Sequence, residues 1–112
     1  PYLDFKKSDY DKAVASDKIV FLDFYANWCP TCRAEAAKLT KGFDSLNSDN
    51  IVGFRVNYND DDTDEDEKNL ASQFEVPYQH YKVVLINGEV VLTDGDIWDE
   101  DKLVEELTKY IK

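Results

Sequence analysis

Cys29 and Cys32, the two cysteines of the chain, stand three positions apart in the stretch FYANWCPTCRAE. A Cys-x-x-Cys pair at the start of a helix can exchange disulfides, because the helix dipole and free N–H groups stabilise a thiolate on the first cysteine. Cys29 would attack a substrate disulfide, and Cys32, one helical turn later, would resolve the mixed disulfide. This chemistry requires a strand before the motif and a helix after it.

Two other interpretations of the cysteine pair stay open on the residues alone, although disulfide exchange is favoured. A structural zinc site usually takes four ligands, and the chain offers one cysteine pair and one histidine, His80. A zinc site closed within one chain would therefore need a carboxylate, whereas two chains could share a site. An inert structural disulfide would be unusual, because so short a loop hardly constrains the unfolded chain.

The segments on either side of the cysteines are predicted to position them. Residues 18–26 (KIVFLDFYA) are apolar and rich in β-branched and aromatic side chains, as expected for a central strand covered on both faces. Asp23 interrupts this strand. A helix is predicted from Pro30, a residue that a first helical turn tolerates, with Gly42 as a point where it could kink or break.

The rest of the chain predicts further helices and strands. Ser8 is the expected N-cap of a first helix, and Asn87-Gly88 is a pair preferred in type I′ hairpin turns. The other predicted elements are a strand near 2–5, a helix over 9–15, a strand over 50–59, a helix from 63 or 64 to about 74, and an amphipathic C-terminal helix. The expected fold class is α/β, with a mixed sheet of four or five strands flanked by helices on both faces, in one domain over residues 1–112.

The chain is strongly acidic, with a net charge of −11. This charge argues against nucleic acids and anionic membrane surfaces as partners. The longest apolar runs are too short to span a bilayer, so no membrane span is expected in this segment. The run DDDTDEDE is interpreted as a solvated loop that leads into a helix, because an EF-hand calcium loop needs a glycine that is absent here.

The sequence begins at Pro1 and contains no methionine. This slightly favours an extracytoplasmic protein from which a signal peptide or anchor has been removed. A cytoplasmic location and a fragment of a longer protein stay open, so the location is unknown at this stage.

The stretch FLDFYANWCPTC resembles the signature of the thioredoxin superfamily: an apolar strand with a buried Asp, then an aromatic residue, Ala, any residue and Trp-Cys-x-x-Cys. FRVNYN resembles the next strand of that family, INGEVV resembles its hairpin, and the similarity covers about residues 5–111. It implies a thioredoxin-like fold and a monomeric protein-disulfide oxidoreductase. Its partners would be protein thiols and disulfides, together with a reductase or oxidase that renews the dithiol. No cofactor and no metal would be needed, because the dithiol carries the electrons.

The resemblance also implies roles for single residues. Cys29 matches the nucleophile, Cys32 the resolving thiol, and Asp23 the buried acid that could exchange a proton with Cys32. Desolvation should raise the pKa of Asp23. Arg55 falls where the family often carries a lysine facing this acid, and a guanidinium would hold Asp23 ionised more firmly than an amine.

The expected substrate groove is formed by Trp28, Pro30, Thr31, Pro77, Tyr78, Gln79 and His80. Family members place a cis-proline seven residues before the hairpin asparagine, and in this chain that position holds His80. Using Pro77 instead requires three extra residues before the turn. A trans bond is expected before His80, because a cis bond without proline costs about 3 kcal/mol or more.

Three roles are open for His80. It could form a polar wall of the groove, or its charged form could stabilise the Cys29 thiolate. It could also be a third ligand beside Cys29 and Cys32, and the alternative function is therefore a metal-binding or partner-binding thioredoxin-like module. The dipeptide Pro-Thr between the cysteines resembles that of glutaredoxin-like and oxidant-type members, and it leaves the reduction potential open.

Overall fold

Five strands form one mixed sheet in the computed structural model, which describes residues 1–111. The elements are β1 (Tyr2–Asp4), α1 (Lys7–Ala15), β2 (Ile19–Tyr25), α2 (Pro30–Leu46), β3 (Ile51–Asn57), α3 (Glu65–Gln73), β4 (Tyr81–Ile86), β5 (Glu89–Asp94) and α4 (Glu100–Thr108). The expected α/β class is confirmed, and the sheet has five strands. None of the helices within this part of the chain is long and apolar enough to cross a membrane.

The central strand is β2, whose residues are all buried. It pairs in parallel with β3 on one side and antiparallel with β4 on the other, in the sheet order β1-β3-β2-β4-β5. The apolar run IVFLDFY fits this place, because a strand paired on both edges and covered on both faces exposes almost nothing to water. The strand before the cysteines is therefore held by neighbouring strands at both edges and by packed side chains on both faces.

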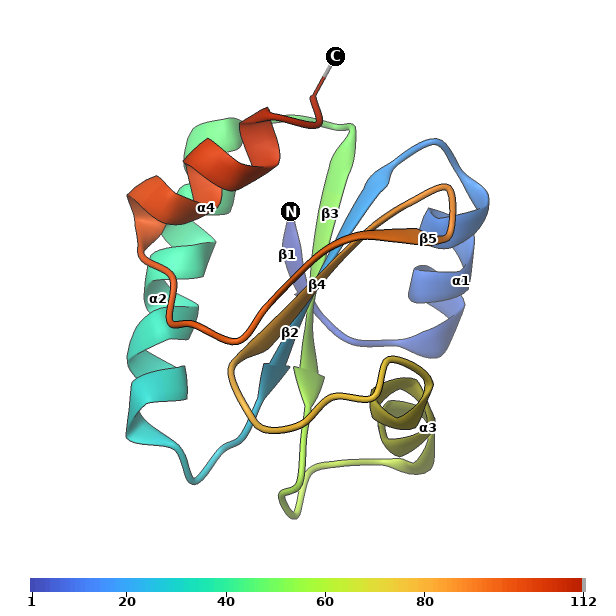
Figure 1. Cartoon of the computed structure of the whole chain (residues 1–112), viewed down its shortest axis with the longest axis vertical. Helices are drawn as coiled ribbons and strands as arrows, with labels where there is room; N and C mark the ends of the chain where they lie inside the picture. Colours follow the sequence, from blue (N-terminus) through green and yellow to red (C-terminus); the bar gives the residue numbers. More distant parts are fainter. Residues whose placement is uncertain (112) are drawn as a thin grey trace.

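Two hydrophobic cores flank the sheet, since alternate residues of a strand point to opposite faces. Helices α1 and α3 cover one face, where Tyr10 and Leu70 pack in the same core as Leu22. Helices α2 and α4 cover the other face, where Leu39 packs in the same core as Phe21. Figure 1 shows the two pairs of helices on opposite sides of the sheet. The cysteines belong to the α2 side.

A side chain caps the start of α3, whereas no side chain caps the start of α1. Asp64 and Glu67 form a reciprocal capping box at the start of α3, where the sequence predicts a helix to begin at 63 or 64. The predicted cap Ser8 is wrong, because α1 begins at Lys7 and Ser8 lies inside its first turn. The reason is the sheet edge: the N–H of Phe5 still donates to the carbonyl of Arg55, so the chain passes directly from β1 pairing into the helix.

Gly42 does not break the helix, since α2 runs without interruption from Pro30 to Leu46. Gly42 faces Leu103 of α4, and a Cβ added at this position would collide with the Leu103 side chain. The missing side chain therefore lets the two helices approach closely. Glycine stands at this position because of a contact between helices, which the pattern of the α2 sequence alone does not reveal.

The hairpin between β4 and β5 turns at Asn87 and Gly88, which have φ angles of 53° and 79°. Positive φ at both positions is what a type I′ turn requires, so the predicted hairpin is confirmed. The C-terminal helix is shorter than its apolar pattern indicates. It ends at Thr108, and Tyr110 and Ile111 pack against the α2-side core from beyond it.

Candidate active site

Cys29 and Cys32 lie where β2 ends and α2 begins. Cys29 is the N-cap residue of α2 and Pro30 occupies the first helical position, so the predicted strand and helix stand on either side of the motif. The backbone N–H of Cys32 donates to Cys29 Sγ at 3.2 Å, and both thiols are in the free form. The Cys29 sulfur therefore sits at the positive end of a long helix with a donor aimed at it, which favours negative charge on that sulfur.

The two thiols have different surroundings, although both are buried. Burial raises the pKa of the Cys32 thiol to about 12, and its hydrogen bond with Cys29 and the nearby charge of Asp23 act in the same direction. Cys32 consequently stays protonated in neutral solution. It can act as a nucleophile only when a neighbouring group takes its proton.

Asp23 lies in the middle of β2 and has no exposed surface. Burial raises the pKa of its carboxyl from 3.8 to about 7, while Lys82 lowers it and Glu35 raises it. The Tyr2 hydroxyl donates to Asp23 Oδ2 at 3.0 Å, and burial raises the pKa of Tyr2 well above its ordinary range, so this phenol keeps its proton. Asp23 can therefore gain or lose a proton near neutral pH.

Arg55, the expected charge partner of Asp23, is its register neighbour on β3. The guanidinium forms its ion pair with Asp4 at 3.0 Å and lies 4.5 Å from the centre of the Tyr25 ring. Its charge lowers the pKa of Asp23, but this effect is smaller than those of burial, Lys82, Glu35 and Tyr2 on the same pKa. The cation in an ion pair with Asp23 is Lys82, whose Nζ lies 3.9 Å from Asp23 Oδ1.

A row of alternating charges crosses the whole sheet at the level of Asp23. Strand register pairs Asp4 with Arg55, Arg55 with Asp23, Asp23 with Lys82, and Lys82 with Asp94. Register partners point to the same face, here the face covered by α2 and α4. We call these five residues the charge row. Of its three inner members, Asp23 and Lys82 are completely buried and Arg55 is half-buried.

Two charged residues of the site, Lys82 and Glu35, are missed by the sequence interpretation. Glu35 lies in α2 three positions after Cys32, and it is as deeply buried as Lys82. The Lys82 ammonium donates to the Glu35 carboxylate. The signal that identified Asp23, a charge within an apolar strand, is also present in YKVVLI, so Lys82 could have been found in the same way.

The predicted groove residues come from two separate loops. Trp28, Pro30 and Thr31 are exposed beside the cysteines, and Pro77 and Tyr78 are exposed in the loop before β4. Gln79 and His80 in that second loop are half-buried. The Trp28 indole N–H donates to the carbonyl of Asn59 at 2.9 Å, which holds an otherwise exposed ring in place.

His80 lies directly before β4 and opposite the end of β2, because its N–H donates to the carbonyl of Phe24 at 2.6 Å. The peptide bond before it is trans, and its φ angle of 55° is left-handed. Its ring Nδ1 lies 2.7 Å from the carbonyl oxygen of Gly95. Since a carbonyl only accepts, Nδ1 carries the proton in this contact. The ring thus joins the loop before β4 to the segment after β5.

A metal-ligand role for His80 receives no support from this geometry. Nowhere in residues 1–111 do three His, Cys, Asp or Glu side chains come together in a way that could hold a metal ion. His80 is therefore not gathered with Cys29 and Cys32 into a three-ligand cluster.

The acidic run after β3 is part of the site, although its sequence predicts only a solvated loop. The backbone N–H of Asn27 donates to Asp60 Oδ2 at 2.8 Å, and its side-chain amide donates to Asp61 at 2.6 Å and Asp62 at 2.9 Å. Arg33 in turn donates to the carbonyl of Asn27 at 2.9 Å. The acidic loop therefore anchors the residues that lead into the Cys-x-x-Cys motif.

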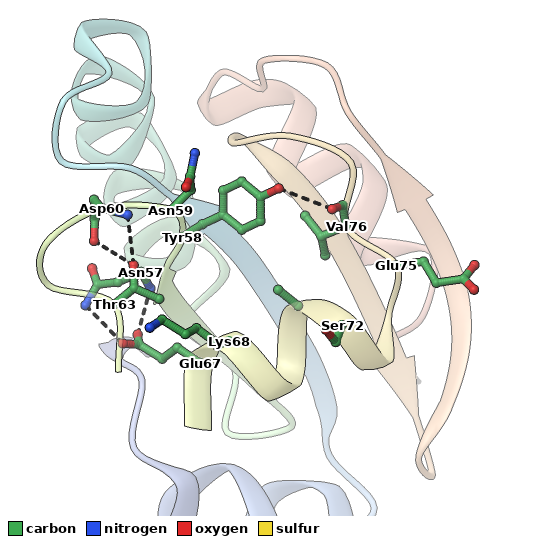
Figure 2. Close-up of a pocket in the computed structure, with 11 residues that line it drawn as sticks. Asn57, Tyr58, Asn59, Asp60, Thr63, Glu67, Lys68, Ser72, Glu75 and Val76 are labelled. Atoms are coloured by element: carbon green, nitrogen blue, oxygen red, sulfur yellow. Dashed lines mark hydrogen bonds between the residues drawn. The ribbon is translucent and has the colours of Figure 1, made fainter. Parts of the chain in front are cut away.

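An open groove of about 930 Å³ lies between the end of β3 and α3. Figure 2 shows Tyr58 reaching across it to the Val76 carbonyl, and Glu67 bonded to Asn57 at the other end. The lining includes none of the cysteines, Asp23 or the predicted groove residues. This groove is therefore separate from the site of the thiols.

Comparisons with known proteins agree with the geometry. The sequence model of the thioredoxin family matches residues 2–109. Mitochondrial thioredoxin of Mus musculus is 34% identical over 101 residues, which cover 90% of this chain and 57% of that protein. A protein disulfide-isomerase of Datisca glomerata is 29% identical over 106 residues, covering 92% of this chain and 20% of that protein. The chain thus spans less than two thirds of either relative.

Solved structures show the same fold. The crystal structure of Trxlp from Edwardsiella tarda EIB202 superimposes with a TM-score of 0.78 at 26% identity, covering 96% of this chain and 98% of that one. Oxidised thioredoxin from Plasmodium falciparum superimposes with a TM-score of 0.73 at 20% identity, covering 97% and 96% of the two chains.

Proposed function

This chain belongs to the thioredoxin family, and we propose from that premise that it exchanges disulfides with protein substrates through Cys29 and Cys32. The position of Cys29 is the observation that carries the proposal. Its sulfur caps α2 and accepts a hydrogen bond from the Cys32 N–H, which is the arrangement a nucleophilic thiolate needs. A second thiol lies one helical turn away, where it can close a disulfide.

The exchange takes two steps. The Cys29 thiolate attacks a substrate disulfide, forms a mixed disulfide and releases one substrate sulfur as a thiolate, which takes a proton from solvent. Cys32 then gives its proton to Asp23 and attacks the Cys29 sulfur, which closes the Cys29–Cys32 disulfide and releases the second substrate sulfur as a thiolate. Asp23 returns the proton to this thiolate. The substrate thus gains two electrons, which the two cysteine sulfurs lose, and two protons, one from solvent and one from Cys32 by way of Asp23. The reverse sequence oxidises a substrate dithiol.

Residues around the cysteines supply a surface for a peptide. Trp28 and Tyr78 are large apolar side chains that remain 51% and 44% exposed. They belong to the loops that follow β2 and precede β4, at the end of β2 where the thiols lie. We expect a polypeptide substrate to pack between them, because exposed aromatic residues next to a reactive group are typical of recognition surfaces. The protein would act as a monomer without a cofactor, and a reductase or oxidase would renew its dithiol.

Two cysteine variants test the proposal. Cys32→Ser should accumulate a stable mixed disulfide with a small disulfide such as Ellman's reagent, since the resolving thiol is missing. Cys29→Ser should react far more slowly, because Cys32 is fully buried and its pKa is about 12. Equal reactivity of the two variants, or no disulfide between the cysteines of the unaltered protein at any redox poise, would contradict the proposal.

The direction of electron flow follows from the reduction potential of the pair. Equilibration with glutathione buffers, followed by mass spectrometry of the alkylated protein, gives this potential. A value close to that of cytosolic thiol reductants indicates a reductase, and a much less negative value indicates an oxidase or isomerase.

A further inference from the structure

Glu35 and Lys82 form a buried ion pair that the exchange steps above do not use. Both side chains are completely shielded from solvent, one from α2 and one from β4. Burying two charges costs free energy even when they are paired, so the pair calls for an explanation. It lies beside Asp23, the group that receives the Cys32 proton in the proposed exchange.

The hydrogen bonds of Lys82 are fully committed. An ammonium group has three N–H donors. They point to the Glu35 carboxylate, to the carbonyl of His80 at 2.7 Å and to the carbonyl of Asp96 at 2.7 Å. No donor is left for Asp23, whose Oδ1 lies 3.9 Å from Lys82 Nζ and, within residues 1–111, has no hydrogen-bond partner.

The hydrogen bonds of the two carboxyls are unequal. Glu35 Oε2 accepts from Lys82 and from the backbone N–H of Trp98, the latter at 2.6 Å. Asp23 accepts from the neutral hydroxyl of Tyr2. Glu35 thus has one charged donor and one backbone donor, whereas Asp23 has one neutral donor; Asp23 Oδ1 and Glu35 Oε1 each have no donor within residues 1–111. Hydrogen bonds from a cation are the stronger ones, and burial raises the pKa of Asp23 to about 7, so Asp23 is the carboxyl placed to take up a proton.

We propose that Lys82 and Glu35 are positioning residues for disulfide exchange: the pair keeps the lysine's donors away from Asp23, so that Asp23 is the carboxyl that takes the Cys32 proton. The same lysine holds the His80 and Asp96 carbonyls together, and it thereby fixes the loop before β4 against the segment after β5. The kinetic part of the proposal rests on the proposed function, whereas the proton distribution does not.

Charged and titratable groups face Asp23 from every neighbouring element: Tyr2 of β1, Arg55 of β3, Lys82 of β4, and Glu35 and Cys32 of α2. The charges of Lys82 and Glu35 act on Asp23 in opposite directions. Their removal should therefore move the Asp23 titration in opposite directions as well. Two substitutions that merely loosened the core would not produce opposite shifts.

Carbon-13 NMR titration of the Asp23 carboxyl in the reduced protein tests the proposal. Glu35→Gln should lower the Asp23 pKa by about one unit, because it removes a negative charge beside Asp23 and replaces the charged acceptor of Lys82 with a weaker, neutral amide oxygen. Lys82→Gln should raise it by a similar amount. Lys82→Met provides a second, apolar replacement of similar length, for use if the glutamine variant unfolds, and its shift should also be upward.

Arg55→Gln is the matched control, since Arg55 is the register neighbour of Asp23 on its other side and is bonded to Asp4. Its shift should be upward and smaller than that of the Lys82 variants. Shifts of the same sign for Glu35 and Lys82 variants, or a larger response to Arg55→Gln, would overturn the proposal.

A kinetic readout separates this proposal from the proposed function. In stopped-flow measurements of mixed-disulfide resolution, Glu35→Gln should move the pH dependence of the rate downward by the same amount as the Asp23 titration. If the unaltered protein resolves no mixed disulfide, the proposed function fails while the titration still decides how the proton is distributed. If the unaltered protein does resolve a mixed disulfide, but Glu35→Gln shifts the pH dependence of the rate and the Asp23 titration by different amounts, only the positioning role fails.

Discussion

Asp23 is a carboxylic acid within an apolar strand, and its titration couples the site to the stability of the protein. Its pKa is raised from 3.8 to about 7 by burial, against the opposing influence of Lys82. An acid with a higher pKa in the folded state binds more protons when folded, so the free energy of unfolding falls as pH rises between these two values. Ionised Asp23 therefore destabilises the fold at the pH where, in the proposed exchange, it accepts the Cys32 proton.

Asp23→Asn should consequently stabilise the protein in alkaline solution. At pH 8 the free energy of unfolding should rise by up to about 4 kcal/mol, the equivalent of the full pKa difference. Near pH 4 the gain should vanish, because Asp23 is then protonated in the folded state. Urea unfolding at both pH values measures the two differences.

Asp17→Asn is the control for Asp23→Asn, since Asp17 is exposed in the turn before β2. It should change the free energy of unfolding by no more than about 0.5 kcal/mol at either pH. A stabilisation by Asp23→Asn that is equal at pH 4 and pH 8 would show that Asp23 titrates near its ordinary value.

The sequence identifies some residues of the site and not their partners. Cys29, Cys32 and Asp23 are recognisable from spacing and from a charge in an apolar run. The sequence does not show whether Arg55 or Lys82 pairs with Asp23, because strand register places both beside Asp23, on opposite sides. Hydrogen bonds from Lys82 to Glu35 and to the Asp96 carbonyl, 47 and 14 positions away, help to decide which cation lies close, and no local pattern contains them.

Among the elements, the acidic loop shows how a polar segment can hold the turn that leads to the Cys-x-x-Cys motif. Asp60 accepts from the Asn27 N–H through Oδ2, and from Thr63 and the Asp62 N–H through Oδ1. One carboxylate therefore orders the loop and ties it to the residue two positions before Cys29. The sequence predicts the loop itself, but its docking depends on contacts between segments more than thirty residues apart.

Asp60→Ala should lower the free energy of unfolding by about 1–3 kcal/mol, because three donors lose a charged acceptor. It should also slow attack by Cys29, since the segment leading to the motif is no longer held. Urea unfolding and the rate of reaction with Ellman's reagent measure the two effects. Asp61→Ala, which removes one bond at an exposed position, is the matched control and should cost less than about 1 kcal/mol. Equal costs for the two variants would contradict the anchoring role.

The contact between α2 and α4 gives a prediction that opposes helix propensity. Gly42→Ala would normally stabilise an exposed helix by up to about 1 kcal/mol. Here the new methyl group meets Leu103, so we expect a net destabilisation of about 1–3 kcal/mol in thermal or urea unfolding. Leu103→Ala should restore part of this loss when combined with Gly42→Ala. A stabilised Gly42→Ala variant would show that α4 can move away at little cost.

Across the whole molecule, a net charge of −11 sets like charges against one another on the surface. Salt screens exposed charges, and it hardly affects buried pairs such as Lys82 with Glu35. The exposed pair Lys7–Asp11 should contribute little in either condition. Repulsion within the folded surface is therefore the electrostatic energy that responds most to ionic strength.

Raising sodium chloride from roughly 0.02 M to about 0.5 M should increase the free energy of unfolding by on the order of 1 kcal/mol. Urea is the suitable denaturant, because it is uncharged and leaves the ionic strength unchanged. Lys68→Gln, which removes an exposed positive charge and makes the surface more acidic, should steepen the dependence on salt. A decrease in stability with added salt would mean that favourable ion pairs outweigh the repulsion.

The charge row also bears on how the chain selects one strand alignment during folding. Side chains alternate between the faces of a sheet, so a slip of one residue in any strand exchanges the faces of all its side chains. A slip of β4 would drive Lys82 into the opposite apolar core and part it from both acids. A slip of β2 would do the same to Asp23, at a cost of several kcal/mol for an unpaired buried charge. The buried charges of Asp23 and Lys82 thus favour one strand register over its alternatives. The arrangement that sets the protonation of Asp23 therefore also makes misaligned sheets less stable.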